Sequence, residues 1–131
     1  MGLPPLFSRI IGERWAAITW TVIIFILLVL PGSSFPEQGV LGKWHLDKLV
    51  HAGIFGTFVW LWHAWYARYH SPDGKTLLRT AIWLFLIGSL YGAGMEFYQK
   101  YFTSREFETA DILADSVGAA LGAAWSMRGK K

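Results

Sequence analysis

Four long apolar segments, separated by short polar stretches, dominate the hydrophobic pattern of this chain. They cover approximately residues 15–30, 49–67, 77–97 and 112–127. Each segment, counted with its flanks, has roughly the 17 to 25 residues that a helix needs to cross a membrane. None of them shows the two-residue alternation of a membrane barrel strand. The pattern therefore predicts an all-α protein, an integral membrane bundle of four transmembrane helices.

Helix-breaking residues lie between the segments and predict short connections. Residues 31–36 (Pro-Gly-Ser-Ser-Phe-Pro) end the first segment, and residues 71–74 (Ser-Pro-Asp-Gly) predict a turn between the second and third. Short connections make neighbouring helices antiparallel. Because the four segments leave no room for a separate soluble domain, we expect residues 1–131 to form a single transmembrane domain.

The composition agrees with this interpretation. Hydrophobic residues make up 53% of the chain and aromatic residues 17%, and the mean hydropathy is +0.34, which is typical of integral membrane proteins. The first segment could instead be a secretory signal peptide, but its apolar run exceeds the usual length of about 7 to 15 residues and no clear A-x-A cleavage site follows it. The chain contains no cysteine, which excludes disulfides and thiolate nucleophiles.

The distribution of lysine and arginine predicts the orientation of the helices. Eight of these residues lie on the side that carries both termini, and four lie on the other side. The first group is Arg9, Arg14, Arg68, Lys75, Arg79, Arg128, Lys130 and Lys131, and the second is Lys43, Lys48, Lys100 and Arg105. By the positive-inside rule, both termini of this multi-pass protein should be cytoplasmic.

Ionisable and polar side chains gather at the outward ends of the last three segments. They are Asp47, Lys48, His51, Glu96, Gln99, Arg105, Asp111 and Asp115. Charged residues in membrane helices are costly and usually mark a functional site. Asp47 and His51 are four residues apart and therefore share a helix face, and Asp111 and Asp115 have the same spacing. Because three helix ends meet at one membrane surface, we expect these side chains to converge.

Pairs of glycines lie on the same helix stripes as the carboxylates of the third and fourth segments. The pairs are Gly88 with Gly92 and Gly118 with Gly122. Small residues at four-residue spacing let two membrane helices approach closely. We expect the two pairs to face each other or a common neighbour, an arrangement that would turn Glu96 and Asp115 into the bundle.

These residues, in this order, resemble the motifs of the VanZ-like family of membrane proteins. The resemblance rests on Asp47-Lys48-Leu49-Val50-His51, on Glu96-Phe97-Tyr98-Gln99, and on Arg105 followed by Asp111-Ile112-Leu113-Ala114-Asp115 and Gly118 to Gly122. It covers about residues 40 to 125, and in relatives the position of Asp115 is more often Asn. The resemblance implies a four-helix protein of the bacterial cytoplasmic membrane. The founding member of the family is associated with resistance to the glycopeptide antibiotic teicoplanin.

Ligand binding is the function that these residues favour most. Lys48 and Arg105 would bind the anionic head group of a lipid-linked cell-wall precursor, or a glycopeptide-like ligand. The other members would line the pocket and set its charge, and they are Asp47, His51, Glu96, Gln99, Asp111 and Asp115. Binding would then alter susceptibility to glycopeptides of the teicoplanin type. Membrane lipids are further expected partners, and the sequence pI of about 9.3 needs no nucleic acid to explain it.

Three alternatives stay open. Glu96 and His51 could serve as acid and base in an intramembrane hydrolase or transferase, with or without a divalent metal. The chain has no H-E-x-x-H motif and no nucleophile elbow, and we expect no cofactor. The charges could instead form a purely structural ion-pair network, although polar contacts between membrane helices average only about 0.6 kcal/mol. A small transporter would need a homo-oligomer, because one such bundle has little room for alternating access.

Overall fold

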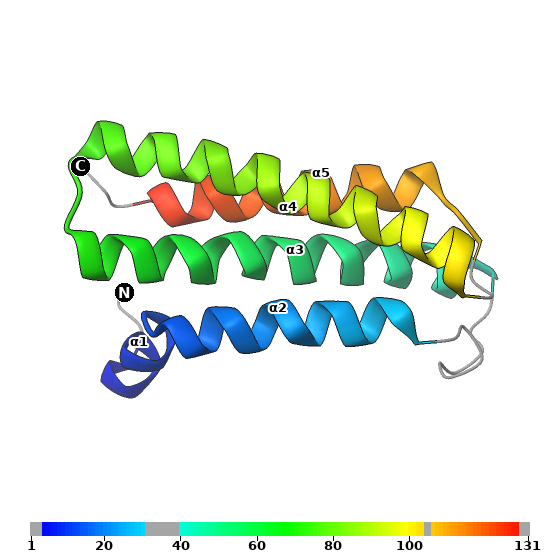
Figure 1. The fold of residues 1–131 in the computed structure, drawn as a ribbon, viewed down its shortest axis with the longest axis horizontal. Coiled ribbons are helices and arrows are strands. Elements are labelled where there is room, and N and C mark those ends of the chain that lie inside the picture. Colours follow the sequence, from blue (N-terminus) through cyan, green and yellow to red (C-terminus); the bar gives the residue numbers. More distant parts are fainter. Residues whose placement is uncertain (1–3, 31–39, 104–105, 129–131) are drawn as a thin grey trace.

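The computed structural model describes residues 4–30, 40–103 and 106–128, and every regular element in these ranges is an α-helix. The all-α prediction is confirmed. The helices are α1 (Pro5–Ile11), α2 (Arg14–Val29), α3 (Val40–His70), α4 (Gly74–Phe102) and α5 (Thr109–Met127). The four long helices form an antiparallel bundle, and α1 and the last turn of α5 lie at the same end of it (Figure 1).

The predicted helices are correctly placed along the chain, but three of them are longer than predicted, and α5 begins at Thr109 rather than near residue 112. α3 begins at Val40 rather than near residue 49, and α4 covers Gly74–Phe102 rather than 77–97. The prediction followed apolar residues, whereas a helix continues through polar turns when their side chains pair with another helix. The short helix α1 was not predicted, because its seven residues contain no long apolar run.

Among the described helices, only α4 is by itself long enough and apolar enough to cross a membrane. α1 and α2 are long enough and apolar enough only when they are taken together, as a pair of helices bent by 66°. α3 falls short because polar and aromatic residues interrupt its apolar run, and α5 because it carries two aspartates. The prediction of four membrane-spanning helices is therefore not confirmed by the helices themselves.

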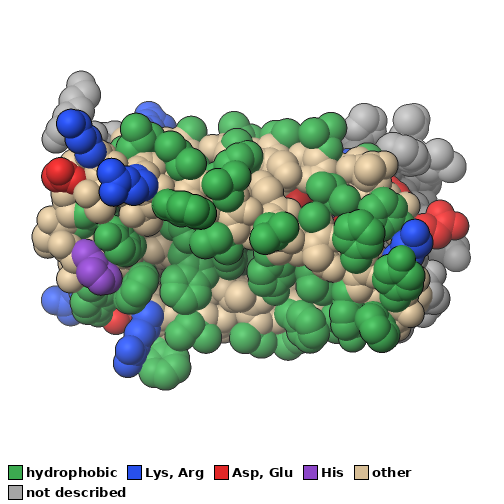
Figure 2. Space-filling view, turned by 45° about the horizontal axis from the view of Figure 1, so that its top comes forward, with side chains coloured by type: hydrophobic (Ala, Val, Ile, Leu, Met, Phe, Trp, Pro, Cys, Tyr) green, Lys and Arg blue, Asp and Glu red, His purple; other side chains and the backbone are tan. Residues whose placement is uncertain are grey.

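The surface of the bundle is nonetheless strongly apolar. Figure 2 shows hydrophobic side chains over the middle of one face and charged side chains gathered towards its two ends. Large apolar side chains are exposed on every described helix, among them Leu90, which is 75% exposed, and Leu121, which is 63% exposed. Soluble monomers rarely expose apolar surface of this extent, which is typical of a surface that contacts a membrane or another protein.

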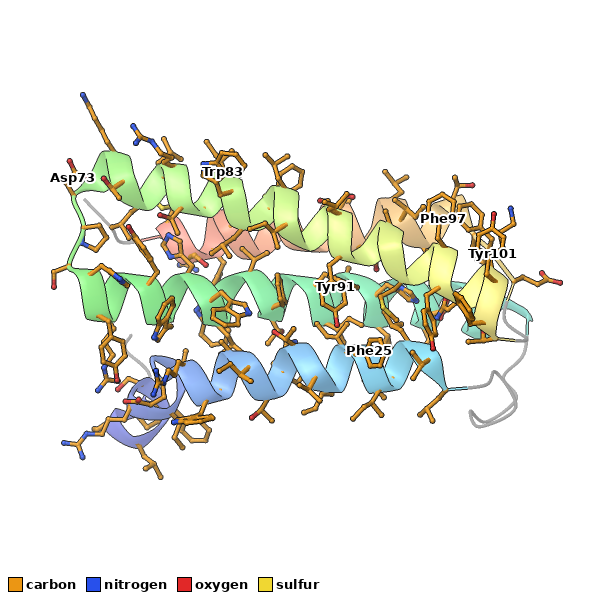
Figure 3. All side chains as sticks on the ribbon, viewed as in Figure 1. Phe25, Asp73, Trp83, Tyr91, Phe97 and Tyr101 are labelled. Atoms are coloured by element: carbon orange, nitrogen blue, oxygen red, sulfur yellow. The ribbon has the colours of Figure 1, made fainter. Side chains whose placement is uncertain are left out.

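A tight turn joins α3 to α4, as the sequence predicted. Ser71 has a φ of 42° in the left-handed region, and its amide N–H donates to the carbonyl of Ala67 at 3.2 Å, which ends α3. Pro72 cannot continue the helix. Asp73 then caps α4, at the far left of Figure 3, by accepting a hydrogen bond from the amide of Thr76 at 2.8 Å. Hydrogen bonds from Thr76 keep the pKa of Asp73 below its usual value.

Aromatic side chains attach α2 to its two neighbours. The indole N–H of Trp20 donates to the carbonyl of Ile54 in α3 at 2.8 Å. The hydroxyl of Tyr91, which points from α4 towards α2 in Figure 3, donates to the carbonyl of Thr21 at 2.9 Å. One turn further along α2, Ile24 is completely buried in the apolar core. Hydrogen bonds between helices of this kind stabilise a bundle in apolar surroundings.

Glycines allow α3 and α5 to touch backbone to backbone. A Cβ added at Gly118 would collide with the backbone of Ala52, and one added at Gly122 would collide with the backbone of Gly56. Gly56 has the reciprocal role, since a Cβ there would lie 2.9 Å from the carbonyl oxygen of Gly118. Side-chain rotation cannot relieve a clash with backbone atoms, so these positions require glycine.

The other predicted glycine pair contacts different atoms. Gly92 of α4 lies against Asp115 of α5, and Gly88 lies against both Ala119 of α5 and Val59 of α3. The atoms nearest to each glycine therefore belong to residues outside the other glycine pair. Of the two predicted arrangements, a common neighbour agrees better with the structure, because α3 contacts Gly88 of the first pair and both glycines of the second pair.

We predict that the variant Gly118→Ala destabilises the bundle by about 1 to 3 kcal/mol, because an overpacked contact forces the two backbones apart. The loss should appear as a lower melting temperature in detergent micelles. Gly94→Ala is the matched control, since a Cβ at Gly94 has no atom within 4 Å, and this variant should be unchanged or slightly more stable. Equal melting temperatures for the two variants would contradict the close contact between α3 and α5.

Candidate functional site

The start of α3, the end of α4 and the start of α5 lie together at the end of the bundle opposite α1 (Figure 1), and polar side chains from all three meet there. The described members, which we call the acidic cluster, are Asp47, Lys48 and His51 of α3, Glu96 of α4, Glu108 just before α5, and Asp111 and Asp115 of α5. Four of them are at most 4% exposed, namely His51, Glu96, Asp111 and Asp115. The predicted convergence is confirmed for six of the eight residues that the sequence named, which are Asp47, Lys48, His51, Glu96, Asp111 and Asp115.

Lys48 connects the acidic cluster across two helices. Its ammonium donates to Glu108 Oε2 at 2.6 Å, to Asp47 Oδ2 at 3.2 Å, and to Asp111 Oδ1. Charge-assisted hydrogen bonds are about twice as strong as neutral ones. Lys48 therefore joins α3 to the beginning of α5, and three carboxylates already surround the cation that the sequence assigned to an anionic ligand.

His51 faces a different carboxylate with each ring nitrogen. Nδ1 lies 2.7 Å from Asp115 Oδ1, which is a hydrogen bond. Nε2 lies 3.8 Å from Asp47 Oδ1 and 3.7 Å from Asp111 Oδ2, and these distances are too long for hydrogen bonds. An ionised Asp115 can only accept, so it fixes the tautomer with the proton on Nδ1 and leaves Nε2 directed at the other two carboxylates.

Glu96 of α4 reaches the start of α5. Its Oε2 accepts a hydrogen bond from the backbone N–H of Glu108 at 3.1 Å, where the dipole of α5 favours a negative charge. Its other oxygen, Oε1, is buried and has no hydrogen-bond partner among the described residues, and the same holds for Oδ2 of Asp115. Buried polar atoms are almost always hydrogen-bonded, so two orphaned carboxylate oxygens in one cluster need an explanation.

The glycine stripe of α4 makes room for these carboxylates. A Cβ added at Gly92 would lie 2.7 Å from the Cβ of Asp115, so only glycine lets Asp115 approach α4 at this height. Glu96 follows Gly92 by one helical turn on the same face. The expectation that Glu96 and Asp115 turn into the bundle is confirmed, since they are 1% and 0% exposed.

Gln99, a predicted member of the site, stands apart from the acidic cluster. The amide of Gln99 donates to the carbonyl of Leu28 at 2.7 Å. This carbonyl is in the last turn of α2, where helical partners are lacking, so Gln99 fastens α2 to α4. Arg105, predicted to bind an anionic head group, lies outside the described residues.

Glu108 belongs to the acidic cluster although the sequence analysis did not select it. It contacts both Lys48 and Glu96, the latter through its backbone N–H. The search for charges inside apolar segments missed it, because it precedes the fourth segment. Its position three residues before Asp111, a spacing that places two residues on one helix face, was the available signal.

The donor atoms of the acidic cluster match those that bind divalent metals. Asp47, His51 and Asp111 each offer one ligand atom, and the three atoms lie within 4.8 Å of one another. Among its described members the cluster has five carboxylates, one ammonium and one imidazole, so negative charge is in excess. The arrangement is suited to a cation or to a ligand rich in hydrogen-bond donors, and the oriented imidazole could also accept a proton.

The sequence matches the model of the VanZ/LLP1 family over residues 6–128. The chain belongs to the VanZ/LLP1 family. The match includes every member of the acidic cluster and confirms the family that the sequence motifs resemble. Membership of the VanZ/LLP1 family supports association with a membrane. The searches among curated proteins and among solved structures gave no significant match.

We predict that Lys48→Met destabilises this VanZ/LLP1 protein by about 3 kcal/mol, because it leaves buried Asp111 without its cation. The estimate takes the lower end for a buried pair, since the side chain of Lys48 is 22% exposed. Adding Asp111→Asn should restore part of the loss in a thermal melt. Lys75→Met, an exposed lysine of α4, is the control and should melt like wild type. A Lys48→Met protein as stable as this control would show that the ion pairs contribute little.

Proposed function

We propose that this chain is a multi-pass protein of the bacterial cytoplasmic membrane. Support comes from the apolar surface of all four long helices and from their lengths. α3 and α4 have 31 and 29 residues, which correspond to about 45 Å. α2 and α5 have 16 and 19 residues, about 24 to 28 Å, against a hydrocarbon core of about 30 Å.

In the proposed orientation both termini are cytoplasmic and the acidic cluster faces outward. The excess of lysine and arginine on the side of the termini favours this topology. The acidic cluster then lies near the outer membrane surface, within reach of molecules in the outer leaflet and outside the cell.

We propose that the acidic cluster binds the polar part of an amphipathic envelope molecule and thereby affects susceptibility to glycopeptides of the teicoplanin type. The observation that carries this proposal is the pair of buried oxygens on Glu96 and Asp115 that no donor in the described part of the chain satisfies. A purely structural ion network would be expected to satisfy its buried acceptors, since leaving one unmade costs about 1 to 3 kcal/mol. A ligand with donor groups would satisfy them.

The charge of the acidic cluster restricts the chemistry of that ligand. Carboxylates accept hydrogen bonds from hydroxyl, amide and ammonium groups. Sugars and peptides carry such donors, and both occur in glycopeptides and in the sugar-peptide part of lipid-linked cell-wall precursors. A bare phosphate would meet an excess of negative charge, because the ammonium of Lys48 already contacts three carboxylates.

An intramembrane acid/base enzyme is the second candidate, and the pairing of His51 with Asp115 at 2.7 Å favours it. A carboxylate that orients an imidazole is the arrangement of many general bases, with the opposite nitrogen left to take a proton. In this reading His51 Nε2 accepts the proton and Glu96 serves as the acid.

We predict that the protein in lipid nanodiscs binds a labelled lipid-linked disaccharide-peptide or teicoplanin saturably, and that Glu96→Gln weakens binding at least tenfold. Glutamine retains the acceptor for the Glu108 amide but removes the charge and adds a donor. Glu13→Gln, at the opposite end of the bundle, should bind like wild type.

Three outcomes of this experiment separate the candidate functions. Saturable binding without product supports the binding protein. Turnover of the lipid that both Glu96→Gln and His51→Gln abolish supports the enzyme. Absence of both binding and turnover, together with a lower melting temperature of the cluster variants, would leave only a structural ion network.

Topology can be tested with single cysteines, because the chain contains none. We predict that Glu106→Cys, an exposed position near the acidic cluster, reacts with an impermeant maleimide in intact cells. Ser71→Cys, in the turn at the other end, should react only after the membrane is opened. The reverse pattern would place the acidic cluster in the cytoplasm and exclude an extracellular antibiotic as its direct ligand.

A further inference from the structure

We propose that Asp47, His51 and Asp111 bind one divalent cation of the zinc or manganese type. The inference rests on the proposed function, because the metal would belong to the same ligand site and would determine what that site can bind. Its ligand atoms are Asp47 Oδ1, His51 Nε2 and Asp111 Oδ2, one atom from each of three side chains on two helices.

The distances between these three atoms suit a shared cation. Nε2 lies 3.8 Å from the oxygen of Asp47 and 3.7 Å from that of Asp111, and all three atoms lie within 4.8 Å of one another. Bonds of about 2.1 Å in a tetrahedral site place ligand atoms about 3.4 Å apart. The two distances to Nε2 would have to shorten by about 0.3 to 0.4 Å, and the distance between the two carboxylate oxygens by up to about 1.4 Å, which rotation of the aspartate side chains would supply.

Lys48 orients both carboxylates towards His51. Its ammonium contacts Oδ2 of Asp47 and Oδ1 of Asp111. The other oxygen of each carboxylate is the one that faces Nε2. A lysine that engages one oxygen of each carboxylate fixes the second oxygen, so the two ligands are positioned before a metal arrives.

Asp115 orients the histidine in the way that metal sites require. Metal-binding histidines almost always donate their other ring N–H to a carboxylate or carbonyl, which fixes the tautomer and makes the free nitrogen a better ligand. Asp115 Oδ1 accepts such a bond from Nδ1 of His51 at 2.7 Å. Asp115 is therefore a positioning residue for His51 rather than a ligand.

The unpartnered oxygens of the acidic cluster are an independent sign of a missing ligand. Within residues 4–30, 40–103 and 106–128, Glu96 Oε1 and Asp115 Oδ2 are buried without hydrogen-bond partners, on side chains that are 1% and 0% exposed. The other oxygen of Asp115 contacts Nδ1 of His51, so this carboxylate lies across the imidazole ring from Nε2, with its Oδ2 against Gly92 of α4. Water bound to the metal would bring hydrogen-bond donors into this buried region.

The ligand set decides which cations fit. Magnesium and calcium prefer all-oxygen sites, whereas one imidazole with two carboxylates suits zinc and manganese. Three protein ligands leave at least one position for an outside group. A metal in this position would let the acid-rich cluster accept a phosphate or pyrophosphate oxygen, which the carboxylates alone would repel.

The test is metal binding by the purified full-length protein in detergent micelles, stripped with a chelator and then titrated calorimetrically with Zn²⁺ and Mn²⁺. We expect one saturable site per chain for at least one of the two ions. His51→Gln should abolish the site, Asp47→Asn should weaken it at least tenfold, and Asp115→Asn should weaken it by about 10- to 100-fold, as loss of an orienting carboxylate does elsewhere. Glu106→Gln, an exposed acid at the same end, should bind like wild type.

Each variant is first checked for an unchanged helical circular dichroism spectrum. Asp47→Asn serves if His51→Gln does not fold, because the side chain of Asp47 is 32% exposed and tolerates an isosteric change. Co²⁺ gives a second readout, since its visible absorption should show imidazole coordination in wild type that His51→Gln lacks. Failure of wild type to bind either ion, or equal binding by all variants, would overturn the proposal.

The metal proposal and the proposed function can fail separately. Stoichiometric metal binding by a protein that binds no envelope ligand would refute the function and retain the metal. Envelope-ligand binding that survives complete chelation, in a protein without a metal site, would refute the metal and retain the function.

Discussion

The direct backbone contact between α3 and α5 is the constraint on which the rest of the bundle depends. Gly118 lies on Ala52, the residue after His51, and this contact fixes how far α5 is displaced along α3. At that displacement Asp115 meets the imidazole of His51, and Asp111 meets Lys48 one turn further on. A bulkier side chain at this contact would separate the helices and pull these pairs apart. The polar pairs therefore depend on the close packing of α3 and α5.

Much of this arrangement could be predicted from the sequence, because isolated charges in apolar helices must face one another. That argument placed Glu96 and Asp115 inside the bundle and brought three helix ends together. It could not predict which charge pairs with which, since pairing depends on distances of an ångström or two. Lys48 was expected to meet a ligand and instead contacts three carboxylates, while Gln99 satisfies a helix end.

The extent of the helices was harder to predict for a related reason. α3 continues for nine residues before the apolar segment near residue 49, and its polar part includes Asp47 and Lys48. A prediction that follows apolar residues ends a helix where polar residues begin. A polar turn nevertheless remains helical when its side chains pair with groups on another helix. Glu108 was not predicted for the same reason, because it lies just outside an apolar segment. Its carboxylate contacts Lys48 and its backbone N–H contacts Glu96.

The glycine contact also means that the acidic cluster keeps its geometry only while the small residues between α3 and α5 are retained. Moving α5 by one residue against α3 would shift Asp115 by about 1.5 Å along the axis and rotate it by about 100° away from His51. A mutation at Gly118 would then be scored as a loss of function, although that position touches no polar group of the cluster. Selection that preserves the acidic cluster therefore also preserves the glycines of the contact between α3 and α5, although glycine has no side chain that could take part in the chemistry.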